Sequence, residues 1–258
     1  MLEKTDKLLF FYENLVNWNA RLAKEGDFIK KIFDACGAKN ILDCGCGLGK
    51  HVFFLRENGY NAHGSDLNPK HYERAKIASE SLNNGAGFFL EDMTELPQQG
   101  DGSWDGVMSL GNTLSSMGKE NVRKAFSAFN RVLGNEGVLI GQILNFAGMV
   151  SGDRTEVRSA VVDGKEVIYV KTFHVEDEHY LVITNVLTRI VEESDGDTDP
   201  VKKWDCMVES TKMYGLSKEF VEESLKDAGF REVRFFGSLA GNDYETTISK
   251  DLVFVAYK

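Results

Sequence analysis

The stretch "ILDCGCGLGKHVFFL", residues 41–55, joins a short apolar run to a glycine-rich turn and then to a helical pattern. An apolar strand, a glycine loop and an amphipathic helix make up the first part of an α/β unit. Gly45, Gly47 and Gly49 permit tight turns and let a ligand approach the main chain. The free amides at the start of the following helix point to the same use. We therefore expect this loop to hold a cofactor.

The spacing of the glycines separates two classes of nucleoside cofactor. A dinucleotide loop has the pattern G-x-G-x-x-G, which requires glycine at position 50 when Gly45 is the first. Lys50 occupies that position, and a count that starts at Gly47 ends on Val52. The pattern that remains is D-x-G-x-G-x-G, led by Asp43. It resembles motif I of the class I S-adenosylmethionine (SAM) methyltransferases, and a turn that binds nothing is the alternative.

Composition and charge narrow the class of protein. The 258 residues are 42% hydrophobic, which is enough for one domain or for one domain with an insertion. The formal net charge of −10 disfavours nucleic acid, and no basic patch offsets it. No apolar run approaches the ~20 residues that span a bilayer, and the N-terminus does not resemble a signal peptide. We expect a cytoplasmic protein without a nucleic-acid or membrane partner, whereas assembly into a homo-oligomer stays open.

The cysteines indicate neither a disulfide framework nor a metal site. Cys36, Cys44, Cys46 and Cys206 are too few and too scattered to staple a chain of this length. Cys44 and Cys46 form C-x-C, which lacks the paired C-x-x-C knuckles of a zinc site, and they lie in a loop that favours small side chains. We therefore expect reduced thiols and no metal.

Strand-like and helix-like segments alternate in the first half of the chain, as in a parallel sheet with helices on both faces. The expected strands are 40–44, 61–65, 87–91, 104–110 and 137–143, and the expected helices are 27–36, 49–58, 69–82 and 119–133. Asn68 is expected to cap the helix that opens at Pro69. Gly134 or Asn135 is expected to end the last of these helices in the left-handed conformation.

The pattern changes between residues 145 and 213, where β-branched and aromatic residues favour antiparallel strands. Three strands are expected, in "EVIYVKTFHV" (166–175), "HYLVITNVLTRIV" (179–191) and "WDCMVESTKMY" (204–214). The acidic "EESDGDTDP" (192–200) is expected to be a solvated hairpin loop. A helix then follows, with Ser217 as its N-cap and Gly229 at its end. The segments "EVRFFGS" (232–238) and "KDLVFVAYK" (250–258) are the last two expected strands.

Acidic residues follow the second and third expected strands. Asp66 lies about 20 residues after the glycine loop, where a carboxylate can accept both hydroxyls of a ribose. Asp92 can accept a hydrogen bond from an adenine amino group, with Met93 or Leu67 against the ring, and a turn residue is the alternative reading of Asp92. The fourth strand opens into Asn112 at the crevice where such sheets bind ligands.

These motifs together resemble class I SAM methyltransferases of the glycine and sarcosine N-methyltransferase type and their small bacterial relatives. The segments concerned are "DCGCGLG", "DLNP", "EDM" and "SLGNTLSSM". The resemblance implies an α/β fold, a Rossmann-like seven-stranded methyltransferase sheet with an antiparallel β insertion after the fifth strand. It divides the chain into N-terminal helices and a SAM-binding core (1–144), a hood insertion over the active site (145–213), and a last helix with the closing strands (214–258).

The resemblance also assigns residues to the site. Arg21 in the W-x-x-R-L segment is expected to bind the carboxylate of SAM, because a guanidinium makes two parallel charge-assisted bonds to it. An ion pair with Glu25 is the alternative. The expected cofactor residues are Trp18, Arg21, Asp43, Gly45, Cys46, Gly47, Gly49, Asp66, Leu67, Asp92, Met93 and Leu110. The expected substrate residues are Asn112, Asn145 and His174, although a structural asparagine in the turn and a packing or surface histidine are alternatives for the last two.

We therefore expect a methyltransferase that moves the methyl group of SAM to a small polar metabolite, with N-methylation of an amine favoured and O-methylation open. SAM carries its own leaving group, so no catalytic dyad is required. Arg154, Arg158 and Arg189 lie off the pattern of a site for an amino-acid carboxylate, so the sequence does not assign glycine as substrate. A non-enzymatic SAM binder or sensor is the alternative function, and an NAD(P)-dependent oxidoreductase is less favoured.

Overall fold

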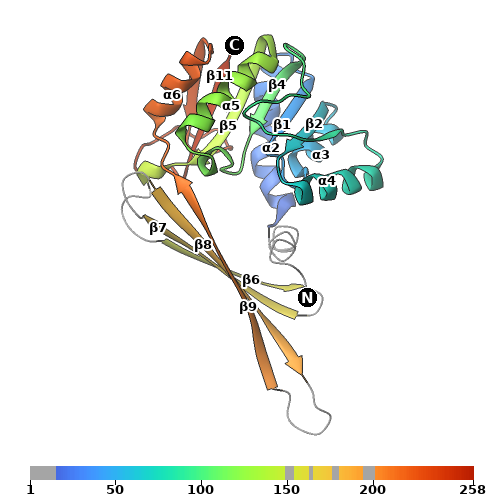
Figure 1. The fold of residues 1–258 in the computed structure, drawn as a ribbon, viewed down its shortest axis with the longest axis vertical. Coiled ribbons are helices and arrows are strands. Elements are labelled where there is room, and N and C mark those ends of the chain that lie inside the picture. Colours follow the sequence, from blue (N-terminus) through green and yellow to red (C-terminus); the bar gives the residue numbers. More distant parts are fainter. Residues whose placement is uncertain (1–15, 149–153, 163–164, 176–179, 194–200) are drawn as a thin grey trace. The chain divides into compact units, whose positions relative to one another are not determined.

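The computed structural model describes residues 16–148, 154–162, 165–175, 180–193 and 201–258 (Figure 1). The chain divides into two compact units. The core unit consists of Trp18–Gly148 and Tyr214–Lys258, and the insertion unit contains the described strands up to Met213. Within the described ranges, every helix is too short or too polar to traverse a bilayer.

The core unit is a seven-stranded sheet with the order β10-β11-β5-β4-β1-β2-β3. Its strands are β1 (Asn40–Cys44), β2 (Asn61–Asp66), β3 (Phe88–Leu90), β4 (Trp104–Ser109), β5 (Leu133–Leu144), β10 (Glu232–Phe236) and β11 (Asp251–Tyr257). The first five run parallel, whereas β11 is antiparallel to β5 and β10 is antiparallel to β11. This arrangement confirms the expected α/β fold and its seven-stranded sheet.

Helices cover both faces of this sheet (Figure 1). They are α2 (Trp18–Ala35), α3 (Lys50–Glu57), α4 (Pro69–Leu82), α5 (Lys119–Val132) and α6 (Lys218–Asp227). Side chains alternate along β1, so Ile41 packs in one buried cluster and Leu42 in the other. Helix α5 contributes Phe126 to the cluster of Leu42, and α2 contributes Phe33 to the cluster of Ile41. The two apolar layers fix β1 at the centre of the unit.

Three of the expected helix ends are confirmed. The side chain of Asn68 accepts a hydrogen bond from the amide of Lys70 at 2.9 Å. Ser217 Oγ accepts one from the amide of Phe220 at 3.2 Å. Gly229 follows α6 with φ +98°, the left-handed conformation expected after a helix.

Two expected helix boundaries are wrong. The expected closure of α5 by Gly134 or Asn135 does not occur, because Leu133 is extended (φ −72°, ψ 140°) and begins β5 directly. The helix expected over 27–36 begins at Trp18, although Gly26 lies in its interior. A Cβ on Gly26 would lie 2.2 Å from Cζ of Phe54, so the glycine leaves room for the Phe54 ring, which a larger residue would displace.

The insertion unit is a four-stranded sheet with the order β6-β7-β8-β9. Its strands are β6 (Arg154–Val162), β7 (Lys165–Val175), β8 (Tyr180–Glu193) and β9 (Val201–Tyr214), and both β6–β7 and β7–β8 are antiparallel. The antiparallel insertion after β5 is therefore confirmed, but with one strand more than expected. Strand β6 was missed because its valines Val157 and Val161 are exposed and mixed with charged residues. The expected acidic loop begins inside β8, and 194–200 lie outside the described residues.

Candidate active site

The glycine loop lies between β1 and α3, at the carboxyl end of the central strand. Gly45, Gly47 and Gly49 have φ values of 76°, 55° and 70°, so each adopts the left-handed conformation that favours glycine. The amides of Gly45 and Cys46 both donate to the carbonyl of Ser65, at 2.8 and 3.0 Å. These bonds hold the loop against the end of β2 and leave those amides unavailable to a phosphate.

Asp66, at the end of β2, connects the glycine loop with the next turn. Its Oδ2 accepts a hydrogen bond from the amide of Gly47, and its Oδ1 accepts one from the amide of Asn68, each at 2.8 Å. His71 Nδ1 lies 3.4 Å from Oδ1. Burial alone would raise the pKa of Asp66, but these donors outweigh it and the pKa is lowered. The carboxylate therefore stays charged and keeps lone pairs for a ligand beside the loop.

Asp43 is a buried carboxyl group without a hydrogen-bond donor in the described part of the chain. Its side chain is 2% exposed, and none of the described residues donates to it. The pKa of Asp43 is raised to about 8, chiefly by burial and also by the Asp66 carboxylate, while the Arg21 guanidinium opposes the rise. A cation next to Asp43 would stabilise its charged form and so offset both the effect of burial and the repulsion by Asp66.

Arg21 belongs to a ring of four side chains that joins α2 to α3. Its Nε donates to Glu25 Oε1 at 2.9 Å, and Glu25 Oε2 lies 2.9 Å from His51 Nε2. The Trp18 ring completes the circuit, with Arg21 Cζ 5.0 Å from its centroid and His51 5.8 Å away, edge to face. The alternative ion pair of Arg21 with Glu25 is thus present. It occupies Nε only, and no described residue hydrogen-bonds the two terminal nitrogens of Arg21, so carboxylate binding by Arg21 stays a prediction.

The segments that follow β3 and β4 pack against the glycine loop. A Cβ on Gly45 would lie 2.9 Å from Met93 Cε and 2.8 Å from Thr113 Cγ2, so these two side chains pack against the loop backbone. Asp92 Oδ1 accepts a hydrogen bond from the amide of Thr94 at 2.8 Å, as the turn alternative predicts. Leu67 is 64% exposed and free to cover an apolar ring.

The chain leaves β4 through a turn with two residues in the left-handed conformation. Leu110 is buried, and Gly111 and Asn112 follow with φ of 70° and 72°. A left-handed asparagine is uncommon, and Asn112 Oδ1 is buried without a hydrogen-bond partner in the described part of the chain. No described atom lies within 4 Å of where a Cβ would stand on Gly47 or Gly111. The loops after β1 and β4 therefore combine open space beside two glycines with a buried, unsatisfied acceptor, which fits a polar ligand.

Of the two remaining substrate candidates, Asn145 follows β5 in the core unit and His174 belongs to the insertion unit. Asn145 is 2% exposed, and its Nδ2 donates to the carbonyls of Thr246 and Ser249, each at 2.8 Å. Its Oδ1 accepts from the hydroxyl of Tyr244 at 3.0 Å. These contacts favour the alternative of a structural asparagine, and substrate contact by Asn145 stays untested. His174 is exposed on β7 of the insertion unit.

Sequence reasoning missed three polar residues of the site. His51 stands in the quoted loop-to-helix stretch, but its neighbours Val52 and Phe53 suggest only an apolar helix face. Glu25 was considered only as a surface partner, whereas its side chain is 12% exposed. Asp251 opens β11 opposite Leu144, and burial raises its pKa. None of them carries a local motif, so only the pairing of distant elements could reveal them.

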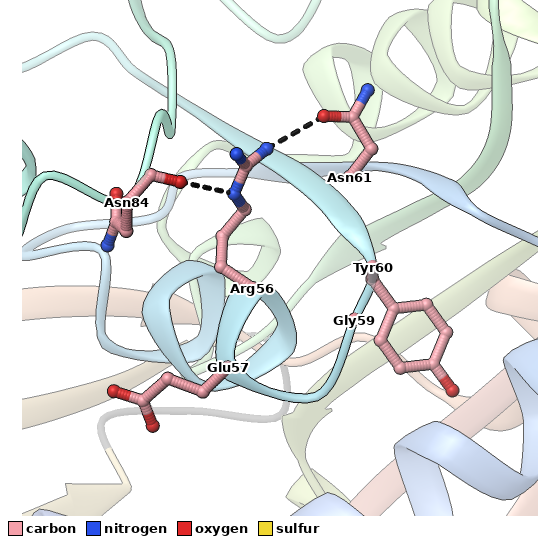
Figure 2. A pocket seen from close by; sticks show the side chains of 6 residues that line it. All are labelled: Arg56, Glu57, Gly59, Tyr60, Asn61 and Asn84. Carbon is pink, nitrogen blue, oxygen red and sulfur yellow. Dashed lines mark hydrogen bonds between the residues drawn. The ribbon is translucent and has the colours of Figure 1, made fainter.

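A separate cavity of about 400 Å³ lies at the amino end of β2, away from the glycine loop. Arg56, Glu57, Gly59, Tyr60, Asn61 and Asn84 line it (Figure 2). Arg56 Nε donates to the carbonyl of Asn84 at 2.8 Å, and Nη1 donates to Asn61 Oδ1 at 2.7 Å (Figure 2). Arg56 therefore ties the loop at Asn84 to the start of β2.

Sequence comparisons identify proteins that are similar to this chain. A family model described as a methyltransferase domain matches residues 41–137. The chain is 29% identical over 229 residues to a glycine/sarcosine N-methyltransferase of Parasynechococcus marenigrum (strain WH8102), which covers 88% of this chain and 75% of that protein.

Two solved structures share the fold over nearly the whole chain. A SAM-dependent methyltransferase from Clostridium acetobutylicum ATCC 824 has a TM-score of 0.75 at 17% identity, with 99% of both chains covered. The sugar N-methyltransferase KedS8 from Streptoalloteichus sp ATCC 53650 has a TM-score of 0.75 at 18% identity, with 100% of this chain and 94% of that one covered. Residues 41–137 thus match a methyltransferase domain, and the chain is a SAM-dependent methyltransferase with SAM as its methyl donor, distantly related to the glycine/sarcosine N-methyltransferases.

Proposed function

We propose that the protein methylates the nitrogen of a small polar amine and releases S-adenosylhomocysteine. The observation that carries the proposal is the surplus of carboxyl groups at the carboxyl end of the sheet. Asp43, Glu25 and Asp251 all lie within electrostatic range of the guanidinium of Arg21, and Lys24 also acts on Asp251. Such a crevice favours cations, and both SAM and an incoming amine carry positive charge.

The residues of the core unit fit SAM without any phosphate group. Arg21 would bind the carboxylate of its amino-acid part with the terminal nitrogens, and Asp43 would accept its ammonium group. Asp66 would accept the ribose hydroxyls, and Asp92 the adenine amino group, with Leu67 against the ring. The loop amides of Gly45 and Cys46 are used internally, which suits a ligand held by side chains and by backbone contact.

When bound, SAM supplies an activated methyl group and its own leaving group, so the protein has to position the acceptor and exclude water. The crevice after β4 would orient the acceptor, with Asn112 Oδ1 taking a hydrogen bond from the amine. We propose that the insertion unit forms a hood that covers this crevice and contributes substrate contacts such as His174. Burial of the reacting groups would then strengthen every charged contact around them.

The names of the relatives favour an amine among small acceptors. One similar protein is a glycine/sarcosine N-methyltransferase, and one similar structure is a sugar N-methyltransferase. Arg158, one of three arginines weighed for a substrate carboxylate, is exposed on β6 and lies 3.8 Å from Glu156. It offers no support for glycine over an amine that has no carboxylate.

A turnover assay tests the proposal. The protein is incubated with SAM and, separately, with glycine, sarcosine, an amino sugar, a phenol and a carboxylic acid, and release of S-adenosylhomocysteine is measured. We expect turnover with an amine and a rate that rises with pH as the amine loses its proton. Turnover confined to the phenol or the acid would contradict N-methylation.

A binding assay tests the cofactor contacts separately. Arg21→Ala should weaken SAM binding by about 1.5–3 kcal/mol, the scale of hydrogen bonds to a charged group, which is roughly 10- to 150-fold. It should leave 5′-methylthioadenosine, which lacks the amino-acid part, within about twofold of the parent. Equal losses for both ligands would refute the carboxylate contact.

A further inference from the structure

We infer that His51 and Glu25 are positioning residues, which together hold Arg21 in the orientation that binds the carboxylate of SAM. This inference rests on the proposed contact of Arg21 with the cofactor. The geometry behind it is the ring of Trp18, Arg21, Glu25 and His51, in which each side chain touches two others. Three of the four come from α2, and His51 comes from α3, directly after the glycine loop.

Glu25 is the centre of the ring because each of its oxygens has one partner. Oε1 accepts from Arg21 Nε and Oε2 faces His51 Nε2, both at 2.9 Å. Burial opposes the charge on this carboxylate, but the hydrogen bond from His51 and the nearby Arg21 prevail and lower its pKa. Glu25 is therefore an anion with both oxygens directed, and it cannot rotate without losing one of the two bonds.

His51 is 6% exposed and is set in place by the start of α3. Burial lowers its pKa, so the ring is neutral at pH 7 and carries one N–H. A carboxylate accepts only, so the proton is assigned to Nε2, which donates to Glu25. The histidine thus anchors Glu25 to the helix that follows the cofactor loop.

The contacts within the ring restrict the orientation of Arg21. Glu25 holds its Nε and the Trp18 ring faces its guanidinium, so the plane of the group is fixed before any ligand arrives. Its two terminal nitrogens, which have no hydrogen-bond partner in the described ranges, are the pair that a carboxylate engages side by side. A fixed guanidinium loses less conformational entropy on binding than a mobile one, which is how a residue that never touches SAM would raise its affinity.

The test compares ligands with and without the carboxylate. His51→Met removes the N–H donor but keeps an apolar side chain of similar volume, whereas His51→Gln keeps an amide donor at a similar reach. We expect His51→Met to weaken SAM binding about fivefold to tenfold and to leave 5′-methylthioadenosine within about twofold. His51→Gln should recover most of the SAM affinity. Equal losses for the two ligands, or no recovery by glutamine, would assign His51 to packing alone.

A double variant separates positioning from independent contact. If His51 acts through Arg21, then Arg21→Ala with His51→Met should bind SAM no more weakly than Arg21→Ala alone. Additive losses would overturn the inference. Should Arg21→Ala itself fail to distinguish the two ligands, the proposed carboxylate contact fails first. Discrimination by Arg21→Ala but not by His51→Met contradicts only the positioning role.

His63 provides the matched control. It lies on β2, where its Nδ1 accepts a hydrogen bond from the amide of Gly87 at 2.9 Å, outside the ring. His63→Met therefore also removes a partly buried histidine with a directed nitrogen. We expect it to change thermal stability and to leave the ratio of the two affinities unchanged. A change in that ratio equal to that of His51→Met would overturn the inference, and Glu25→Gln should reproduce the effect of His51→Met.

Discussion

The two ends of the parallel strands carry similar polar residues in opposite states of hydrogen bonding. At the amino end, Asp105 Oδ2 accepts from the amides of Lys39 and Asn40 at 2.9 and 2.8 Å. Arg56, also at that end, donates to Asn84 and Asn61. At the carboxyl end, Asp43 has no donor among the described residues.

The same difference separates the two arginines. Arg56 uses both its Nε and one terminal nitrogen to hold the chain, whereas Arg21 uses Nε alone. Buried polar groups that lack partners cost stability, so a fold retains them where a ligand completes them. The comparison teaches that Asp105 and Arg56 at the amino end are used to hold the chain together, whereas Asp43 and the terminal nitrogens of Arg21 at the carboxyl end have no hydrogen-bond partner among the described residues, which is why we propose them as SAM contacts.

The largest expected effect is on SAM binding and comes from replacing Asp66 at the carboxyl end of the sheet. Asp66→Ala should weaken SAM binding by about 1.5–3 kcal/mol, because it removes a charged acceptor for the ribose and the anchor of the Gly47 amide. Calorimetric titration measures the change, and a melting curve checks that the protein remains folded. An unchanged dissociation constant would leave Asp66 a purely structural link.

The next effect concerns stability. Asn145→Ala should lower the free energy of unfolding by about 2 kcal/mol, because the carbonyls of Thr246 and Ser249 and the hydroxyl of Tyr244 lose their partner. Urea denaturation measures this, and SAM affinity should stay within about twofold. A variant with unchanged stability but lost turnover of the substrate would return Asn145 to the substrate site.

A smaller effect, on the pH dependence of SAM affinity, is expected from Asp43, whose pKa is about 8 in the ligand-free protein. Near pH 7 the carboxyl group is protonated, and a bound cation lowers its pKa, so SAM binding releases close to one proton. Affinity should therefore rise, by about tenfold per pH unit at most, as pH increases toward 8. Titrations in buffers of different ionisation enthalpy count the proton, and Asp43→Asn should abolish its release. Proton uptake on binding would contradict the assignment.

The same group makes the ligand-free fold sensitive to pH. The folded pKa of Asp43 is raised above its ordinary value of 3.8, so its contribution to stability is complete below that value and is lost as pH rises through about 8. Asp43→Asn should therefore flatten the decline in melting temperature between pH 6 and 9. Identical pH profiles for the variant and the parent would show that Asp43 is not the titrating group.

The smallest effect is expected at the amino end. Arg56→Ala should cost about 1 kcal/mol of unfolding free energy, since it removes partly exposed hydrogen bonds to Asn84 and Asn61. SAM affinity should not change, which makes this variant the control for Arg21→Ala. Loss of SAM affinity in Arg56→Ala would break the contrast between the two ends.

Local sequence was sufficient for the sheet and for the cofactor loop. The strand at 40–44 and the helices beginning near Lys50, Pro69 and Lys119 follow from apolar periodicity and caps, which depend only on nearby residues. The spacing of the three glycines excluded a dinucleotide loop. This spacing is a local feature of the sequence, because each glycine provides its backbone freedom at its own position. The seven strands and the antiparallel insertion were also predicted from the pattern of apolar, β-branched and turn residues along the chain.

Only the tertiary structure decided which polar side chains are satisfied. Asn145 looks like a substrate ligand in sequence, but the Thr246–Ser249 segment, a hundred residues away, uses both its hydrogens. Gly26 looks like a helix boundary until Phe54 is packed against it. His51 meets Glu25 only because α2 and α3 pack together. Hydrogen bonding and burial depend on groups that folding brings together from distant positions, and no local pattern of residues records them.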